Sequence, residues 1–234
     1  MYRVQKLLSI IGYCSRRSAE ELIRSGQIKI NDKIAVIGDK WKEGDTLKIN
    51  NKEINLDLAY TQKIRVIKYH KPIGEVVSVK DPHNLDTVFK HLPRVDSKWI
   101  NIGRLDLNTS GLILFTNHGD LANRLMHPSY KYDREYIVTT DKPLSKRDID
   151  LLLTGVPIND GDTGKFDDIL DFDNNTYKVI LSTGKNKEIR NSLKYLKLKT
   201  ISLHRIRYSS IKIGDLKEGE YKDLTDIEIS NFLT

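Results

Sequence analysis

A short polar loop near the middle of the chain carries the residues best suited to chemistry. It runs from Gly103 to Gly111, between two apolar segments with strand character, and contains one carboxylate, Asp106. A carboxylate held in such a loop can attack an electrophile or take a proton. The ordinary alternative is a tight connection in which Asp106 and Asn108 hydrogen-bond to nearby backbone, and the residue types alone do not decide between the two.

The sequence of this loop resembles the active-site signature of a known enzyme family. The segments Gly103-Arg104-Leu105-Asp106 and Thr109-Ser110-Gly111-Leu112 are similar, without a gap, to the signature of the RNA pseudouridine synthases, specifically the RsuA/RluB branch. In that family the aspartate of the loop is the catalytic residue, and the resemblance assigns this role to Asp106. Arg104 is then expected either to contact RNA phosphate or to fix the loop.

Two further side chains fall on positions that resemble the family's site. Tyr136 stands in an Arg-Glu-Tyr context like that of the family's active-site tyrosine, and its alternative is an ordinary half-buried strand tyrosine. Arg190 ends a segment, 184–190, that resembles the family's second signature, although the two residues after it depart from the usual pattern. The resemblance implies that Tyr136 stacks on an extruded base and that Arg190 keeps Asp106 ionised.

Positive charge is concentrated near the N-terminus. The net charge is +7, and residues 1–52 hold eleven Lys and Arg against six Asp and Glu. The helix–turn–helix–strand pattern of this segment resembles the RNA-binding domain first seen in ribosomal protein S-four. Its basic side chains would neutralise RNA phosphates, and a solvated charged face is the alternative. The predicted RNA-binding residues are Arg3, Lys6, Arg16, Arg17, Arg24, Lys29 and Arg104.

The elements that must position these residues mix strands and helices without regular alternation, which is typical of an α+β domain with a largely antiparallel sheet. Apolar patterns predict strands at 64–69, 76–79, 131–138, 177–182 and 201–213. Helices are predicted at 4–11, from Ser18 with a Ser18–Glu21 capping box, from Ser145 with Asp148, and from Thr225 with Glu228. Residues 159–175, rich in Gly, Asp and Asn, are predicted to form a polar loop.

The chain is therefore expected to contain three segments. Residues 1–52 form the RNA-binding domain, 53–61 a linker, and 62–234 the catalytic domain. The turn Lys71-Pro-Ile-Gly74 resembles one that the family carries at the opening of its catalytic domain.

Composition limits the chemistry. The single Cys14 excludes an internal disulfide and a cysteine-based zinc site, and the six histidines, at 70, 83, 91, 118, 127 and 204, are scattered. No phosphate-binding glycine loop is present. Because uridine isomerisation requires no cofactor, we expect no metal and no nucleotide cofactor. The absence of a long apolar run predicts a cytoplasmic protein with no membrane segment.

The resemblance implies an rRNA pseudouridine synthase that isomerises a uridine in 23S rRNA, either as naked RNA or in a pre-ribosomal particle. A 16S rRNA enzyme has the same layout and stays open. A non-catalytic RNA-binding ribosome-assembly factor is a further alternative, which retention of Asp106, Tyr136 and Arg190 together disfavours. A DNA-binding protein would need a recognition helix, and the short N-terminal helices offer no clear one.

Overall fold

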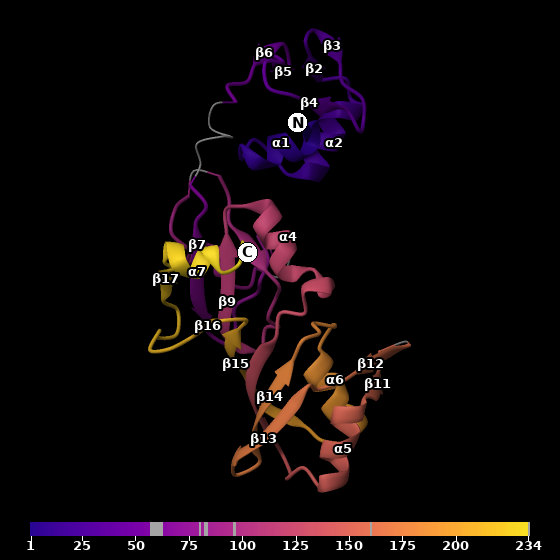
Figure 1. The fold of residues 1–234 in the computed structure, drawn as a ribbon, viewed down its shortest axis with the longest axis vertical. Coiled ribbons are helices and arrows are strands. Elements are labelled where there is room, and N and C mark those ends of the chain that lie inside the picture. The colour runs from indigo at the N-terminus through magenta and orange to yellow at the C-terminus, as the bar shows by residue number, and fades with distance from the viewer. Residues whose placement is uncertain (57–62, 80, 82–83, 96, 160, 234) are drawn as a thin grey trace. The chain divides into compact units, whose positions relative to one another are not determined.

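The computed structural model divides the chain into two compact units (Figure 1). Unit 1 comprises Met1–Ile64 with Arg94–Trp99, and unit 2 comprises Arg65–Pro93 with Ile100–Thr234. The structure describes residues 1–56, 63–79, 81, 84–95, 97–159 and 161–233. Within these residues no helix has both the length and the apolar character needed to cross a membrane.

Two short helices, α1 (Val4–Ile10) and α2 (Arg16–Arg24), open unit 1. The prediction that the second helix begins at Ser18 with a capping box to Glu21 was wrong. Ser15 is the N-cap, and its hydroxyl accepts the backbone N–H of Ser18 at 3.1 Å. Arginine is a good helix former, so the two arginines after Ser15 extend the helix back to the earlier cap.

Short strands pack against these helices. One sheet has the order β3-β2-β5-β6, and a separate pair joins β1 to β4. The strands are β1 (Tyr2–Arg3), β2 (Ile28–Ile30), β3 (Lys33–Ile34), β4 (Lys40–Trp41), β5 (Leu47–Ile49) and β6 (Lys52–Glu53). Glu53, predicted as the first linker residue, pairs with Lys48 in this sheet, and residues 57–61 of the predicted linker lie outside the described residues. Leu7, Leu8 and Trp41 belong to the buried core.

The main sheet of unit 2 has the order β13-β14-β10-β15-β9-β7-β17, with β16 beside β15 and β8 beside β9. Its strands are β7 (Val66–Lys71), β8 (Ile100–Ile102), β9 (Ser110–Thr116), β10 (Arg134–Thr140), β13 (Asp168–Asp173), β14 (Thr176–Leu181), β15 (Thr200–Tyr208), β16 (Ile211–Lys212) and β17 (Tyr221–Asp223). Among the described pairings of this sheet, β15 with β9 is parallel and the others are antiparallel.

The sheet's residue patterns explain its packing. β9 is buried along its whole length, as an apolar central strand should be. β14 alternates buried and half-buried residues, and its inward side chains Tyr177, Val179 and Leu181 pack in one core with residues of α5 and α6. The helices of unit 2 are α4 (Gly119–Met126), α5 (Lys146–Thr154), α6 (Glu188–Tyr195) and α7 (Asp226–Ser230), with single turns η1 (Val88–Lys90) and η2 (Pro128–Tyr130).

Two assignments from the sequence, a strand at 76–79 and a loop at 159–175, were wrong. Residues 76–79 form no strand, and only an isolated bridge joins Val76 to Thr87. The expected polar loop at 159–175 instead contains β12 (Asp162–Gly164), which pairs with β11 (Val156–Ile158), and the edge strand β13. An edge strand can carry polar residues on exposed positions, which hid the pattern. The positive φ angles of Asn174 and Asn175 make the tight turn into β14.

Candidate active site

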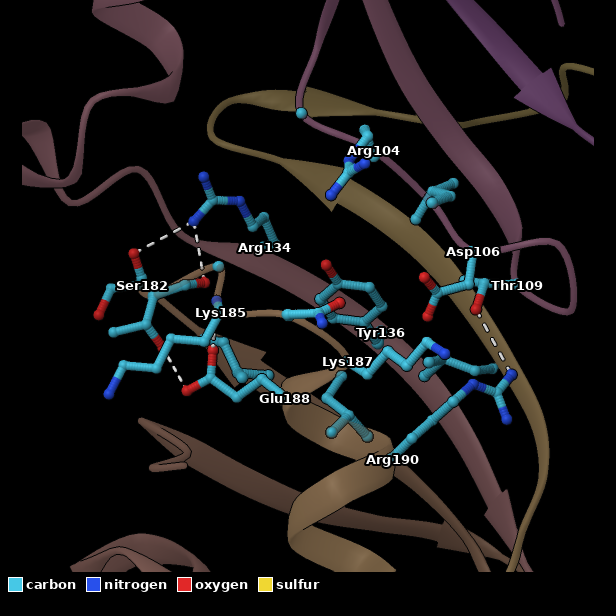
Figure 2. Close-up of a pocket in the computed structure, with 18 of the residues that line it drawn as sticks. Arg104, Asp106, Thr109, Arg134, Tyr136, Ser182, Lys185, Lys187, Glu188 and Arg190 are labelled. Atoms are coloured by element: carbon cyan, nitrogen blue, oxygen red, sulfur yellow. Dashed lines mark hydrogen bonds between the residues drawn. The ribbon is translucent and has the colours of Figure 1, made fainter. Parts of the chain in front are cut away.

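A cavity of about 680 Å³ in unit 2 brings together four of the predicted site residues (Figure 2). Arg104 and Asp106 come from the central loop, Tyr136 from β10 and Arg190 from the first turn of α6. The other predicted RNA-binding residues belong to unit 1. Arg3, Arg16, Arg17 and Arg24 are exposed there, while Lys29 donates to Asn51 at 3.0 Å and Lys6 lies 5.5 Å from the ring centre of Tyr2.

Strand β15 sets the positions of Asp106 and Tyr136 relative to each other. Arg205 on β15 pairs with Tyr136 on β10 and with Gly111 on β9, so the end of the Asp106 loop lies in register with the tyrosine. Glycine is required at position 111, where β9 pairs with β15. Its φ is +107°, and a Cβ there would lie 2.2 Å from the carbonyl oxygen of Arg205.

Asp106 is half-buried and faces the cavity (Figure 2). Its backbone carbonyl accepts the N–H of Thr109 at 3.0 Å, which closes a turn in the loop. Among the described residues its carboxylate has no hydrogen-bond or ion-pair partner. Both carboxylate oxygens are therefore available to a bound substrate.

Arg190 contacts the loop rather than the carboxylate. Its Nη2 donates to the carbonyl oxygen of Asn108 at 2.7 Å and lies 3.4 Å from Oγ1 of Thr109. The guanidinium thus joins α6 to the last two residues of the turn that begins at Asp106.

Lys71 is a further cation of this region to which sequence reasoning gave no role. Its fully buried ammonium donates to the carbonyl oxygens of Pro72 at 2.7 Å and Thr109 at 2.9 Å. Burial lowers the pKa of Lys71 to about 8, and the charges of Glu75 and Asp106 oppose that shift. The signal was present in the Lys-Pro-Ile-Gly turn, which was used only to mark the start of a domain.

Buried Glu188, also without an assigned role, holds one wall of the cavity. Its carboxylate accepts the hydroxyl of Thr183 at 2.7 Å and the backbone N–H of Lys185 at 3.0 Å. Arg134 reaches the same wall from β10 and donates to the carbonyl oxygens of Ser182 and Thr183 at 3.1 and 3.0 Å (Figure 2). The wall is therefore fixed from two elements before any ligand arrives.

One group of possible metal ligands occurs among the described residues, outside this cavity. Ligand atoms of Glu75, Asp86 and His91 lie within 4.8 Å of one another. They are already paired, because His91 Nε2 lies 2.8 Å from Asp86 and 3.5 Å from Glu75, and Tyr69 donates its hydroxyl to Glu75 at 2.8 Å. Hydrogen bonds from His91 and Lys90 lower the pKa of Asp86 to about 2. His83 lies outside the described residues.

Comparison with known proteins identifies the family. Residues 65–207 match the family model described as RNA pseudouridylate synthase, and residues 3–47 match the S4 domain. The chain belongs to the RNA pseudouridine synthase family. The family, the α+β fold class and the enzyme class predicted from the sequence are therefore confirmed.

Similar proteins agree with this family over nearly the whole chain. A ribosomal large subunit pseudouridine synthase B from Vibrio cholerae is 36% identical over 238 residues, covering 99% of this chain and 74% of the relative. The protein of the same name from Buchnera aphidicola is 38% identical and covers 98% of this chain and 95% of the relative. A crystal structure titled pseudouridylate synthase shares the synthase fold, with a TM-score of 0.71 at 23% identity, covering 99% of this chain and 100% of the other.

Proposed function

We propose that this pseudouridine synthase isomerises a uridine of 23S rRNA, with Asp106 as its catalytic carboxylate. The observation that carries the proposal is that Asp106, Tyr136 and Arg190, from three separate elements, line one cavity. The large-subunit names of the relatives favour 23S over 16S rRNA. This substrate places the reaction in the cytoplasm, where bacterial ribosomes assemble, on either naked rRNA or a pre-ribosomal particle.

The reaction is an isomerisation. The bond between uracil N1 and ribose C1′ breaks, the base turns, and a bond forms between C5 and C1′. The proton on C5 is released and N1 gains one, so atoms and electrons balance without a cofactor. Asp106 takes part as a carboxylate, either by attack on the substrate or by removal of a proton, and among the described residues its side chain has no hydrogen-bond partner to displace first.

Two cations hold the loop that carries Asp106. The ammonium of Lys71 and the guanidinium of Arg190 both bind the residues just after Asp106. The two cations hold the loop in place, with Asp106 in the lining of the cavity.

Tyr136 supports the extruded base. Removing a uridine from its stack costs about a few kcal/mol, and stacking on an aromatic ring can offset part of that cost. The ring lines the same cavity as Asp106 and packs against the core formed by β14 and α6. It is therefore a rigid surface on which uracil can lie.

We propose the division into an RNA-binding domain at 1–52 and a catalytic domain at 62–234. The basic residues of the first domain bind phosphates and hold the substrate, while the cavity of the second performs the reaction. Phosphate contacts of this kind contribute affinity but little choice of sequence.

Release of tritium from rRNA labelled at uridine C5 tests the function. Wild-type protein, Asp106→Asn and Asp171→Asn would each be incubated with 23S and 16S rRNA, because Asp171 is an exposed carboxylate outside the cavity. We expect release from 23S rRNA by the wild type and Asp171→Asn, and loss of roughly three orders of magnitude or more in Asp106→Asn.

Other outcomes separate the alternatives. Release from 16S rRNA alone would reassign the subunit. Binding of rRNA or pre-ribosomal particles without any release would favour a non-catalytic assembly factor and overturn the proposal.

A further inference from the structure

A cationic aromatic turn, residues 124–132, borders the cavity and has no role in the proposed mechanism. Tyr130 is 50% exposed and lies against Tyr132 with ring centres 6.0 Å apart and planes inclined by 17°. The guanidinium of Arg124 lies 5.3 Å from the centre of the Tyr130 ring. An exposed tyrosine within such an array is typical of surfaces that stack nucleobases.

The cationic aromatic turn is held rigidly. Nδ1 of His127 lies 2.8 Å from the hydroxyl of Ser129 and accepts its backbone N–H, which caps η2. On the other side, Tyr132 meets the buried ring of Phe232 edge to face, with centres 6.2 Å apart. A ring that is already fixed loses little conformational entropy when a ligand stacks on it.

Charge and position favour RNA as the ligand. Residues 124–132 contain the cations Arg124 and Lys131 and no Asp or Glu. Pro128 and Lys131, on either side of Tyr130 in the chain, line the same cavity as Asp106. A strand of RNA that delivers a uridine into the cavity must pass its rim, and this part of the rim combines aromatic surface with positive charge.

A purely structural role does not explain Tyr130. Half of the residue is exposed, and its hydroxyl has no hydrogen-bond partner among the described residues. The contacts of its ring with Arg124, His127 and Tyr132 therefore leave part of Tyr130 accessible, and a base can stack there.

We propose that Tyr130 is a stacking platform for the base of a nucleotide next to the target uridine, with Lys131 beside it to bind phosphate. The inference rests on the proposed function of the cavity. It adds a second base-binding position to the one at Tyr136, and this position acts on RNA binding rather than on the chemical step.

Four variants test the platform. Tyr130→Ala removes the ring, Tyr130→Leu keeps apolar bulk without a ring, and Tyr130→Phe keeps the ring. Phe172→Ala, 70% exposed on β13, is the control for loss of an exposed aromatic elsewhere in the same unit. Each is measured by tritium release from C5-labelled 23S rRNA over a range of RNA concentrations, with thermal unfolding recorded in parallel.

We expect KM to rise about tenfold in Tyr130→Ala and Tyr130→Leu, with little change in kcat, since loss of one base–aromatic stack is typically worth about that factor. Tyr130→Phe and Phe172→Ala should match the wild type. Equal KM values for Tyr130→Ala and Phe172→Ala would overturn the inference. So would wild-type behaviour of Tyr130→Leu.

A fluorescence measurement separates this inference from the proposed function. The probe is a short single-stranded RNA whose one uridine has 2-aminopurine beside it. Wild type and Tyr130→Phe should quench its fluorescence by stacking, and Tyr130→Ala and Tyr130→Leu should not. Unchanged quenching in Tyr130→Ala contradicts the platform, whereas absence of tritium release by wild type contradicts the proposed function alone.

Discussion

Lys71 is the least expected side chain near Asp106, because ammonium groups are seldom buried completely. Two backbone carbonyls and the charges of Asp106 and Glu75 compensate part of the desolvation cost. The remaining imbalance lowers its pKa to about 8, close to neutral pH. One side chain thereby makes the charge around the Asp106 loop sensitive to mild alkali.

The pKa of Lys71 predicts an alkaline limit to catalysis. Its ammonium is present below about pH 8 and is lost as pH rises through that value. Single-turnover tritium release should therefore fall above pH 8 in the wild type. In Lys71→Met the rate should be about tenfold or more below the wild-type rate at each pH, and it should not change as pH rises through 8. An unaltered alkaline fall in Lys71→Met would show that another group is responsible.

A substitution at Gly111 tests the close pairing of β9 with β15. Gly111→Ala places a Cβ 2.2 Å from the carbonyl oxygen of Arg205 at a φ of +107°, so the strands must separate. We expect a loss of unfolding free energy of about 3 kcal/mol or more, measured by denaturant titration. Gly219→Ala, with φ +78° and no atom within 4 Å of the added Cβ, is the control and should cost only about 1–2 kcal/mol. Equal losses would mean that backbone strain alone explains the effect.

At the scale of elements, an ion-pair cluster ties the start of β10 to β15. Arg207 on β15 lies 2.5 Å from Asp133 and 2.8 Å from Glu135, just ahead of Tyr136. Hydrogen bonds from Arg207 lower the pKa values of both carboxyl groups. Because a register shift separates Glu135 from Tyr136 in this pairing, the cluster fixes the strand where the ladder is irregular.

The ion-pair cluster predicts a pH-dependent contribution to stability. A carboxyl whose folded pKa is depressed stabilises the fold above its ordinary pKa of about 4, and the contribution is lost as pH falls through the lower folded value. Arg207→Met should lower the free energy of unfolding by about 1–3 kcal/mol at pH 7. Thermal unfolding at pH 7 and pH 3 measures the difference from wild type, which should shrink in acid. A constant difference would indicate a packing effect of the arginine stem.

Local signals predicted some elements correctly and missed others for physical reasons. The capping boxes Ser145–Asp148 and Thr225–Glu228 both form, since a cap depends on residues three positions apart. The strands in 159–175 were missed because they are edge strands with mostly exposed residues. Their sequences therefore lack the alternation of apolar and polar residues that marks a half-buried strand.

The residues of the candidate site likewise divide into those that the sequence predicted and those that it missed. The positions of Asp106, Tyr136 and Arg190 followed from segments that resemble family motifs. Lys71 and Glu188 also stand in segments that resemble family motifs, but sequence reasoning assigned neither of them a role, because their importance arises from their partners. Lys71 binds the carbonyl of Thr109, 38 residues away, and Glu188 binds the Thr183 hydroxyl across a bend before α6. Only the fold makes these contacts visible.

For the whole molecule, the uneven charge predicts that unit 1 supplies most of the nonspecific RNA affinity. Arg16 and Arg17 are exposed in the first turn of α2, where positive charge opposes the helix dipole. Replacing them should therefore not weaken the helix. Their placement is better explained by a bound anion than by stability.

The double variant Arg16→Gln/Arg17→Gln should bind rRNA more weakly, with kcat at saturating RNA unchanged. A plot of log affinity against log salt concentration should lose about 0.7–0.9 in slope for each phosphate contact removed. Lys217→Gln/Lys222→Gln, which removes the same charge from exposed positions of unit 2, is the matched control. A salt slope that changes equally in both variants would refute a special role for the N-terminal arginines.

The position of β15 in the sheet determines when the catalytic unit can fold during synthesis. This strand, Thr200–Tyr208, lies between β9 and β10, and it is synthesised long after both. Until it inserts, no strand pairing among the described residues joins the half that carries Asp106 to the half that carries Tyr136. Pairings between such distant segments form slowly. We therefore expect a nascent chain to bring Asp106 and Tyr136 into register only after β15 has emerged from the ribosome and paired with both neighbours.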